Sequence, residues 1–108
     1  MTTNGQDETE IISVSHENLG TINKNKVSIT TSKGGITLYF SYNTIVGFCG
    51  NGDDATLQNY WSNTTGKLLN ELEPDKSKRL NQEDFNKRLN RAFKGLVLTK
   101  EEITEREI

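Results

Sequence analysis

Residues 38–70, LYFSYNTIVGFCGNGDDATLQNYWSNTTGKLLN, decide the fold, because they hold six of the chain's eight aromatic residues and its Asn-Gly turn signal. From Ile36 onward, every second residue is a candidate to face a core. These residues are Ile36, Leu38, Phe40, Tyr42, Thr44, Val46 and Phe48. This period of two predicts strand with one face on a core. Because the run exceeds the usual strand length and residues 41–43 are polar, we expect two strand segments, which either share a register or are joined by a turn.

Turn signals on both sides of this run predict a chain of hairpins. Asn51-Gly52 suits the tight type I′ turn, so a second hairpin should lead into a strand within residues 55–61. Lys33-Gly34-Gly35 predicts the hairpin before Ile36, since paired glycines can adopt positive φ. Residues 11–14 and 27–31 are loosely alternating and predict two more short strands around a turn at residues 17–20. We therefore expect four to five mainly antiparallel strands.

The clearest helix signal is the segment LNQEDF at residues 80–85. Asn81 is a good N-cap, acids follow in the first turn, and Leu80 and Phe85 are spaced as a hydrophobic staple. A long amphipathic helix over residues 82–96 should cover one face of the sheet, and Phe93→Ala should unfold or severely weaken the domain. Gly95 falls too early for its end, so residues 96–98 form either the last helical residues or a short extended segment. The stripe facing the sheet comprises Phe85, Leu89, Ala92, Phe93 and Leu96.

The rest of the chain completes an α+β domain over residues 11–98. Side-chain oxygens in residues 62–65 can cap a short helix that runs through Leu68 and Leu72 and ends before Pro74. Residues 1–10 carry three acids and no base, which is typical of a disordered arm. Residues 99–108 form a charged tail whose Thr99 can open a last helical turn.

Composition narrows the classes of protein to consider. Cys49 is the only cysteine, which excludes an internal disulfide and a multi-thiolate metal site. The mean hydropathy is -0.70, and no apolar run reaches the length of a membrane span. The N-terminus also lacks the order of a secretory signal. We therefore expect a soluble cytoplasmic protein, with no metal, no cofactor and no membrane partner.

Motifs with catalytic chemistry are weak throughout the chain. His16 has no second histidine at ligand spacing, and nothing in the sequence brings it to Cys49 as a nucleophile–base pair. The turn at Asp53 and Asp54 lacks the regularly spaced acids and the distal Glu of a calcium-binding loop. Residues 64–67, TTGK, lack the first glycine of a phosphate-binding loop. We therefore expect no enzymatic activity.

Two surfaces are candidates for binding. The first is basic, because residues 76–94 contain seven basic and two acidic residues, and Lys87, Arg91 and Lys94 fall opposite the apolar stripe. Such a patch can attract phosphate backbones, although Glu83/Lys87 and Asp84/Arg88 are also the pairs that stabilise a solvated helix. Further bases, Lys76, Lys78 and Arg79, precede that helix.

The second candidate surface is aromatic and comprises Tyr39, Tyr42, Tyr60 and Trp61. Adjacent residues in a strand point to opposite faces, so Tyr60 and Trp61 cannot both face the core if that segment is extended. An exposed ring can stack on a base or anchor a protein interface, and packing in the core or in a dimer is the alternative.

Residues 39–48, YFSYNTIVGF, and residues 59–70, NYWSNTTGKLLN, resemble a group of small uncharacterised proteins encoded by phages and archaeal viruses. The resemblance implies an accessory protein of a virus or mobile element. Our hypothesis is a non-enzymatic protein that binds a host or viral protein, for example as a host-directed inhibitor, and that can form a homodimer. The alternative is a nucleic-acid-binding module that uses Lys87, Arg91 and Lys94.

Overall fold

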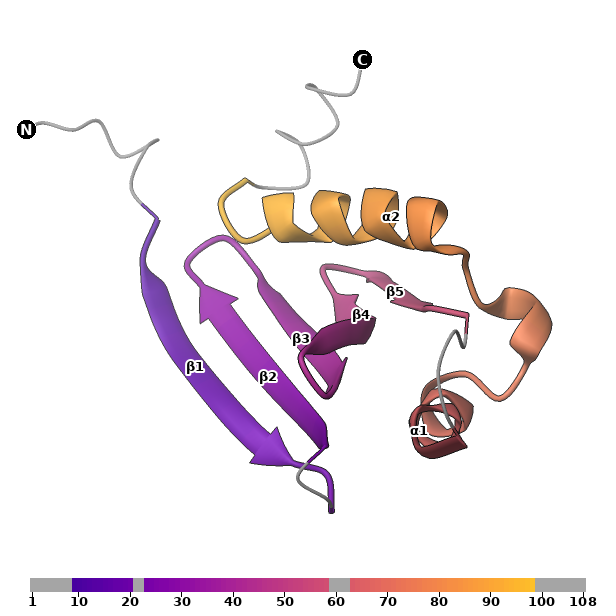
Figure 1. Ribbon diagram of the computed structural model, residues 1–108. Coiled ribbons are helices and arrows are strands. Elements are labelled where there is room, and N and C mark those ends of the chain that lie inside the picture. Colours follow the sequence, from indigo (N-terminus) through magenta and orange to yellow (C-terminus); the bar gives the residue numbers. More distant parts are fainter. Residues whose placement is uncertain (1–8, 21–22, 59–62, 99–108) are drawn as a thin grey trace, which may run out of the picture.

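The protein has an α+β fold in which two helices lie against one antiparallel sheet (Figure 1). The computed structural model describes residues 9–20, 23–58 and 63–98. Within these residues the sheet has five strands in the order of the sequence, so each strand pairs with the next. The strands are β1 (Ile11–Asn18), β2 (Lys24–Thr31), β3 (Gly35–Ser41), β4 (Thr44–Gly50) and β5 (Asp53–Thr56). The helices are α1 (Asn63–Leu72), the short 3-10 helix η2 (Lys76–Lys78) and α2 (Gln82–Lys94). The predicted fold class and strand number are confirmed.

The alternating run around residue 42 forms two strands that are joined by a turn. Tyr42 takes a φ of 56° between β3 and β4, which closes a hairpin at the polar residues 41–43. At the next turn Asn51 and Gly52 take φ values of 54° and 83°. Positive φ at both central residues is what a type I′ turn requires, so the predicted β4–β5 hairpin is confirmed.

The β2–β3 hairpin is also present, but the sequence-based reason for it is wrong. Positive φ occurs at Gly20 and Gly52 among the described glycines, and not at Gly34 or Gly35. The Thr31 hydroxyl instead closes the turn, accepting from the backbone N–H groups of Lys33 at 3.1 Å and Gly34 at 3.3 Å. Gly34 is needed for space, because a Cβ there would collide with the Gly95 carbonyl oxygen and the Asn51 side chain.

A β-bulge in β4 divides the core between the two faces of the sheet. Tyr39 pairs with Gly47, but Phe40 pairs with Ile45, so β4 has one extra residue at this point. Such a bulge turns the extra residue, Val46, toward the face of its neighbour. Val46 is fully buried in a cluster with Leu68 and Leu69 of α1, whereas Phe48 faces α2. The prediction that Val46 and Phe48 share one face is therefore wrong.

The larger core cluster lies between the sheet and α2. Its centre is Phe85, which is 1% exposed and whose ring lies 5.8 Å from that of Phe48. Phe93 is partly buried and packs against this cluster, as the stripe predicted, and the effect of Phe93→Ala stays a prediction. The buried members are Ile36, Leu38, Phe48, Leu57, Phe85, Leu89 and Ala92.

Helix α2 begins as predicted and ends earlier than predicted. The Asn81 side chain accepts from the N–H of Asp84 at 2.8 Å, with Glu83 and Asp84 in the first turn. The helix has thirteen residues and stops at Lys94, where Gly95 is the C-cap. Residues 96–98 continue as turns, and the Leu96 carbonyl oxygen accepts from the Thr31 hydroxyl. Neither a longer helix nor an extended segment is present at this point.

The side chain of Asn51 joins three elements, and we call this contact the Asn51 brace. Its Oδ1 accepts from the N–H of Gly35 at 3.2 Å, and its Nδ2 donates to the carbonyl of Ala92 at 3.0 Å. The β4–β5 turn is thereby tied both to the start of β3 and to the last turn of α2.

Several predictions fall wholly or mainly outside the described residues. They concern the arm at residues 1–8, the tail at residues 99–108, and the side chains of Tyr60 and Trp61. Glu10, which we assigned to the arm, belongs to the folded part: its N–H donates to the Ser32 hydroxyl at 3.1 Å, and its carbonyl accepts from the Ser32 N–H at 2.9 Å.

Candidate functional site

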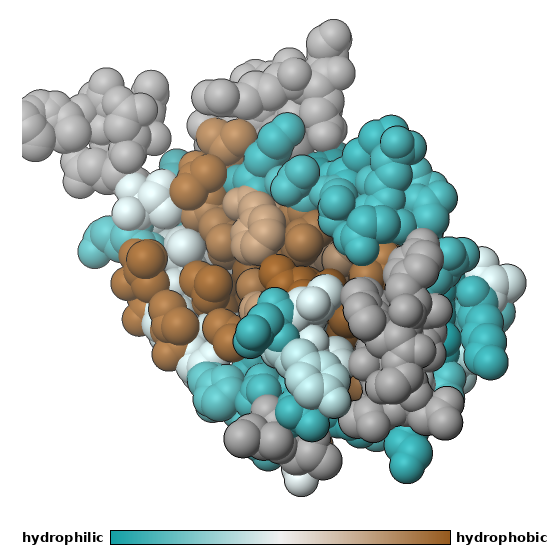
Figure 2. All heavy atoms as spheres, viewed as in Figure 1, coloured by the Kyte–Doolittle hydropathy of each residue, from teal (hydrophilic) through white to brown (hydrophobic). Residues whose placement is uncertain are grey.

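The strand β1 is the most exposed strand of the described structure. All eight of its residues are exposed, and the exposed fractions of Ile11, Ile12 and Val14 are 70%, 66% and 61%. It forms one edge of the sheet, and no strand of the described residues lies beyond it (Figure 1). Figure 2 shows apolar atoms exposed on this side of the molecule, next to α2. A long edge strand with apolar side chains in water is unusual, because such an edge invites pairing.

The backbone of β1 offers hydrogen-bonding groups along this edge. Leu19 donates its N–H to the carbonyl of Lys24 at 2.9 Å, so the groups of Leu19 point toward β2. Direction alternates along a strand, and therefore Ser15 and Glu17 also bond toward β2 while Val14 and His16 point outward. The edge is thus a row of N–H and C=O groups that another strand can pair with.

The opposite edge of the sheet is protected against such pairing. Strand β5 has only four residues and begins with two acids. The guanidinium of Arg88 on α2 pairs with the Asp53 carboxylate and donates to the Asp54 carbonyl at 3.0 Å. The hydrogen bond with Asp53 raises the pKa of Arg88 above its ordinary value. Short length, charge and a covering helix are the usual protections of an edge, and β1 contains neither lysine nor proline.

The predicted basic surface is formed in part. Lys87, Arg91 and Lys94 are exposed on α2, and their spacing places them along one side of the helix. Lys76 is exposed on η2. The structure therefore presents these four cations to solvent, whereas nucleic-acid binding by them stays a prediction.

Arg79 does not belong to that surface. It is only 6% exposed, and its guanidinium donates to Asn70 Oδ1 at 2.6 Å and to the carbonyl of Glu73 at 3.0 Å. These bonds hold the end of α1 against the segment that leads to α2. The candidate binding role of Arg79 is wrong, because its side chain is buried and its N–H donors bond to two acceptors within the fold.

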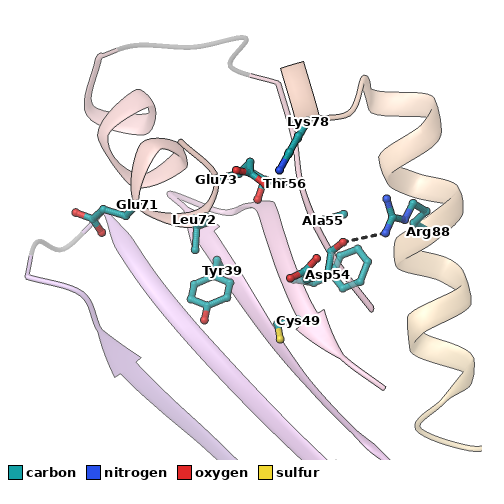
Figure 3. Close-up of a pocket in the computed structure, with 11 residues that line it drawn as sticks. Tyr39, Cys49, Asp54, Ala55, Thr56, Glu71, Leu72, Glu73, Lys78 and Arg88 are labelled. Atoms are coloured by element: carbon teal, nitrogen blue, oxygen red, sulfur yellow. Dashed lines mark hydrogen bonds between the residues drawn. The ribbon is translucent and has the colours of Figure 1, made fainter. Parts of the chain in front are cut away.

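A cavity of about 470 Å³ lies between the end of α1 and the sheet (Figure 3). Tyr39 of the predicted aromatic surface is half-buried and lines it, as does the exposed thiol of Cys49. Charges of both signs surround the cavity, so it can hold a small polar group. Its walls comprise Tyr39, Phe48, Cys49, Asp54, Ala55, Thr56, Glu71, Leu72, Glu73, Lys78 and Arg88.

The structure separates the two residues weighed as a catalytic pair. His16 lies on β1 and Cys49 on β4, three strand spacings or about 14 Å apart. The register places His16 on the face of Phe48, and Cys49 points to the other face. His16 bonds Asn25 Oδ1 at 2.8 Å. Over residues 9–20, 23–58 and 63–98, no group of three or more His, Cys, Asp or Glu side chains could hold a metal ion.

The edge at β1 was missed by sequence reasoning although its strand was predicted. The sequence signal for an edge was weak, because an alternating pattern does not show whether a further strand pairs with it. None of the helices in the described part of the chain is long and apolar enough to cross a membrane.

The model of a family of unknown function, DUF8033, matches residues 10–87, which is more than half of the chain. The chain therefore belongs to this family. The match includes the whole sheet, α1 and the first half of α2. No curated protein and no solved structure matches the chain.

Proposed function

We propose that this member of the DUF8033 family acts without catalysis, by binding a protein through strand addition at β1. The observation that supports this proposal is an eight-residue edge strand whose Val14 and His16 backbone groups face outward. In strand addition, main-chain hydrogen bonds supply affinity and alternate side chains supply specificity. Ile11 and Val14 can supply that specificity, because they pair with Thr31 and Ile29 and so lie on one face.

The biological setting is part of the same proposal. The likeness of residues 39–48 and 59–70 to phage and archaeal-virus proteins supports an accessory protein of a mobile element, such as a host-directed inhibitor. The exposed, free thiol of Cys49 suits a reducing compartment, which supports action in the cytoplasm of the host cell.

Proline substitutions test the proposal, because neighbouring residues of β1 differ in the direction of their N–H. Val14→Pro removes an outward donor, and an edge strand tolerates proline at such a position. Ser15→Pro removes a donor to β2 and should weaken the fold. We expect Val14→Pro to keep its circular dichroism spectrum and to lose the protein that the natural chain captures from host cells.

A control separates the edge from general apolar exposure. Val97 is 51% exposed and lies outside the sheet, so Val97→Ser should retain the captured protein. Retention of that protein by folded Val14→Pro would contradict strand addition at β1.

The second candidate function is nucleic-acid binding by α2, which is favoured by the exposed row of Lys87, Arg91 and Lys94. Each phosphate contact contributes about -0.9 to the slope of log K against log salt, so three contacts predict a slope of roughly -2 to -3. Reversal of the three charges should abolish binding to a DNA or RNA duplex, while Lys67→Glu on α1 should not. Unchanged binding after the triple reversal would exclude this function.

A further inference from the structure

We infer that the cavity between the end of α1 and the sheet binds a small diamino acid, a molecule with two ammonium groups and one carboxylate (Figure 3). The inference is independent of strand addition at β1, because the described walls of the cavity contain no residue of that strand. The volume of about 470 Å³ falls within the range of ligand pockets, which is roughly 300 to 1,000 Å³.

The floor of the cavity is a row of three residues on neighbouring strands. Tyr39 of β3 pairs with Gly47 of β4, which pairs with Thr56 of β5. A Cβ at Gly47 would lie 2.7 Å from Leu72 Cδ1 at the end of α1 and 3.8 Å from Thr56 Oγ1. The glycine therefore lowers the floor between two larger side chains. A glycine inside a strand often marks a place where a ligand or another backbone approaches closely.

The hydroxyl of Thr56 is an independent sign of a ligand. The residue is only 7% exposed, and its hydroxyl forms no hydrogen bond with the described residues. In the described part of the chain, no side-chain polar atom that is sealed from solvent lacks a partner, so this hydroxyl must open into the cavity that the residue lines. A buried polar group without a partner costs free energy, which a ligand recovers when it forms the missing hydrogen bond.

Charged groups of both signs face this space from three parts of the chain. Asp54 is on β5, Glu73 follows α1, and Lys78 is on η2; Figure 3 shows their side chains directed toward the same space. The N–H of Asp75 donates to Glu73 Oε2 at 3.2 Å, which orients that carboxylate. Neither Asp54 nor Glu73 forms an ion pair with Lys78. Charges that surround one cavity without pairing are available to a ligand that carries both signs.

The other charges of the walls leave this balance unchanged. The guanidinium of Arg88 is paired with Asp53, so its charge is compensated within the fold. Figure 3 shows the carboxylate of Glu71 directed away from Lys78. Two carboxylates and one ammonium group remain, which is the complement of a ligand with two ammonium groups and one carboxylate.

The first test compares three small molecules by titration of the full chain, followed by the amide resonances of Cys49, Asp54 and Thr56 in two-dimensional NMR. The probes are L-lysine, L-norleucine, which lacks the second ammonium group, and 1,5-diaminopentane, which lacks the carboxylate. We expect L-lysine to saturate these shifts below about 10 mM and each other probe to bind about two- to tenfold more weakly, because it loses one charged contact. Absence of saturation by L-lysine, or equal affinity for all three probes, would overturn the inference.

Thr56→Val separates binding of the ligand from a structural role of the hydroxyl. Valine keeps the shape of the side chain, and the hydroxyl that it removes bonds to no described residue, so the free energy of unfolding in urea should not fall. The affinity for L-lysine should fall about two- to tenfold through the lost hydrogen bond. A less stable variant that retains the full affinity would show that the hydroxyl serves the fold, and would contradict the site.

Two cationic residues of η2 provide a matched pair. Lys78 lines the cavity, whereas Lys76 is exposed on the same helix and does not. Lys78→Gln should weaken binding of L-lysine about two- to fivefold and strengthen binding of 1,5-diaminopentane, because it removes a group that attracts a carboxylate and repels an amine. Lys76→Gln should change neither affinity. Equal effects of the two substitutions would indicate attraction by general charge and would refute a diamino acid site in this cavity.

Discussion

The Asn51 brace makes a quantitative prediction about the stability of the domain. Asn51→Ala removes the hydrogen bonds to Gly35 and Ala92, each worth about 0.5 to 1.5 kcal/mol. It also places alanine at a φ of 54°, which costs roughly 1 to 2 kcal/mol. The expected loss is about 2 to 5 kcal/mol in the free energy of unfolding. A domain of this size has only about 5 to 15 kcal/mol in total.

A second variant separates the two contributions. Asn51→Gly loses the same side-chain bonds but accepts positive φ without strain, so it should cost about 1 to 3 kcal/mol. Urea denaturation followed by circular dichroism measures both variants, and an unchanged m value shows that the comparison is valid. Equal losses for alanine and glycine would refute the backbone argument. A loss below about 0.5 kcal/mol for alanine would refute the brace itself.

Three further substitutions test other parts of the fold by the same denaturation assay. Phe85→Ala should cost about 3 to 5 kcal/mol, and Phe93→Ala clearly less, because only Phe85 is fully buried; equal losses would contradict this assignment of the core. Arg79→Ala should lower the free energy of unfolding by about 2 to 3 kcal/mol, because it removes the bonds to α1 and the following loop. A change of less than about 0.5 kcal/mol would contradict the buried, bonded position of Arg79. Gly50→Ala should lower the free energy of unfolding far more than Gly47→Ala. A Cβ at Gly50 would lie 2.7 Å from a backbone Cα, whereas a Cβ at Gly47 would lie 2.7 Å from the flexible end of a leucine side chain. The reverse order would contradict the packing.

The parts of the fold that were predictable depend on local signals. Asn51-Gly52 specifies its own turn geometry, and Asn81 with two following acids specifies a helix start. The prediction of strand within residues 36–48, as distinct from the face of Val46, similarly required only neighbouring residues. These features were confirmed because no distant contact competes with them.

The parts that were not predictable depend on contacts between distant residues. Alternation in a sequence does not reveal an inserted residue in a strand pair, so the position of Val46 required the register. Arg79 is one of seven basic residues within residues 76–94, and only the acceptors at Asn70 and Glu73 distinguish it from the others. The early end of α2 likewise follows from the close packing of Gly95 against Asn51.

The same reason limits prediction of the candidate site. The sequence identified β1 as a strand but contained no direct record of its place at the edge of the sheet. The exposure of Ile11 and Val14 follows from α2 lying over the other half of the sheet. An apolar alternating strand reads the same in a sequence whether its face is covered or open.

The strict nearest-neighbour order of the strands has a consequence for the kinetics of folding. Every strand pairs with the strand that follows it in the chain, so no long loop has to close before contacts form. Local strand pairing of this kind favours rapid formation of the sheet. During synthesis the β1–β2 hairpin emerges before β3. The growing chain therefore exposes the apolar side chains of β1 before the rest of the sheet has formed.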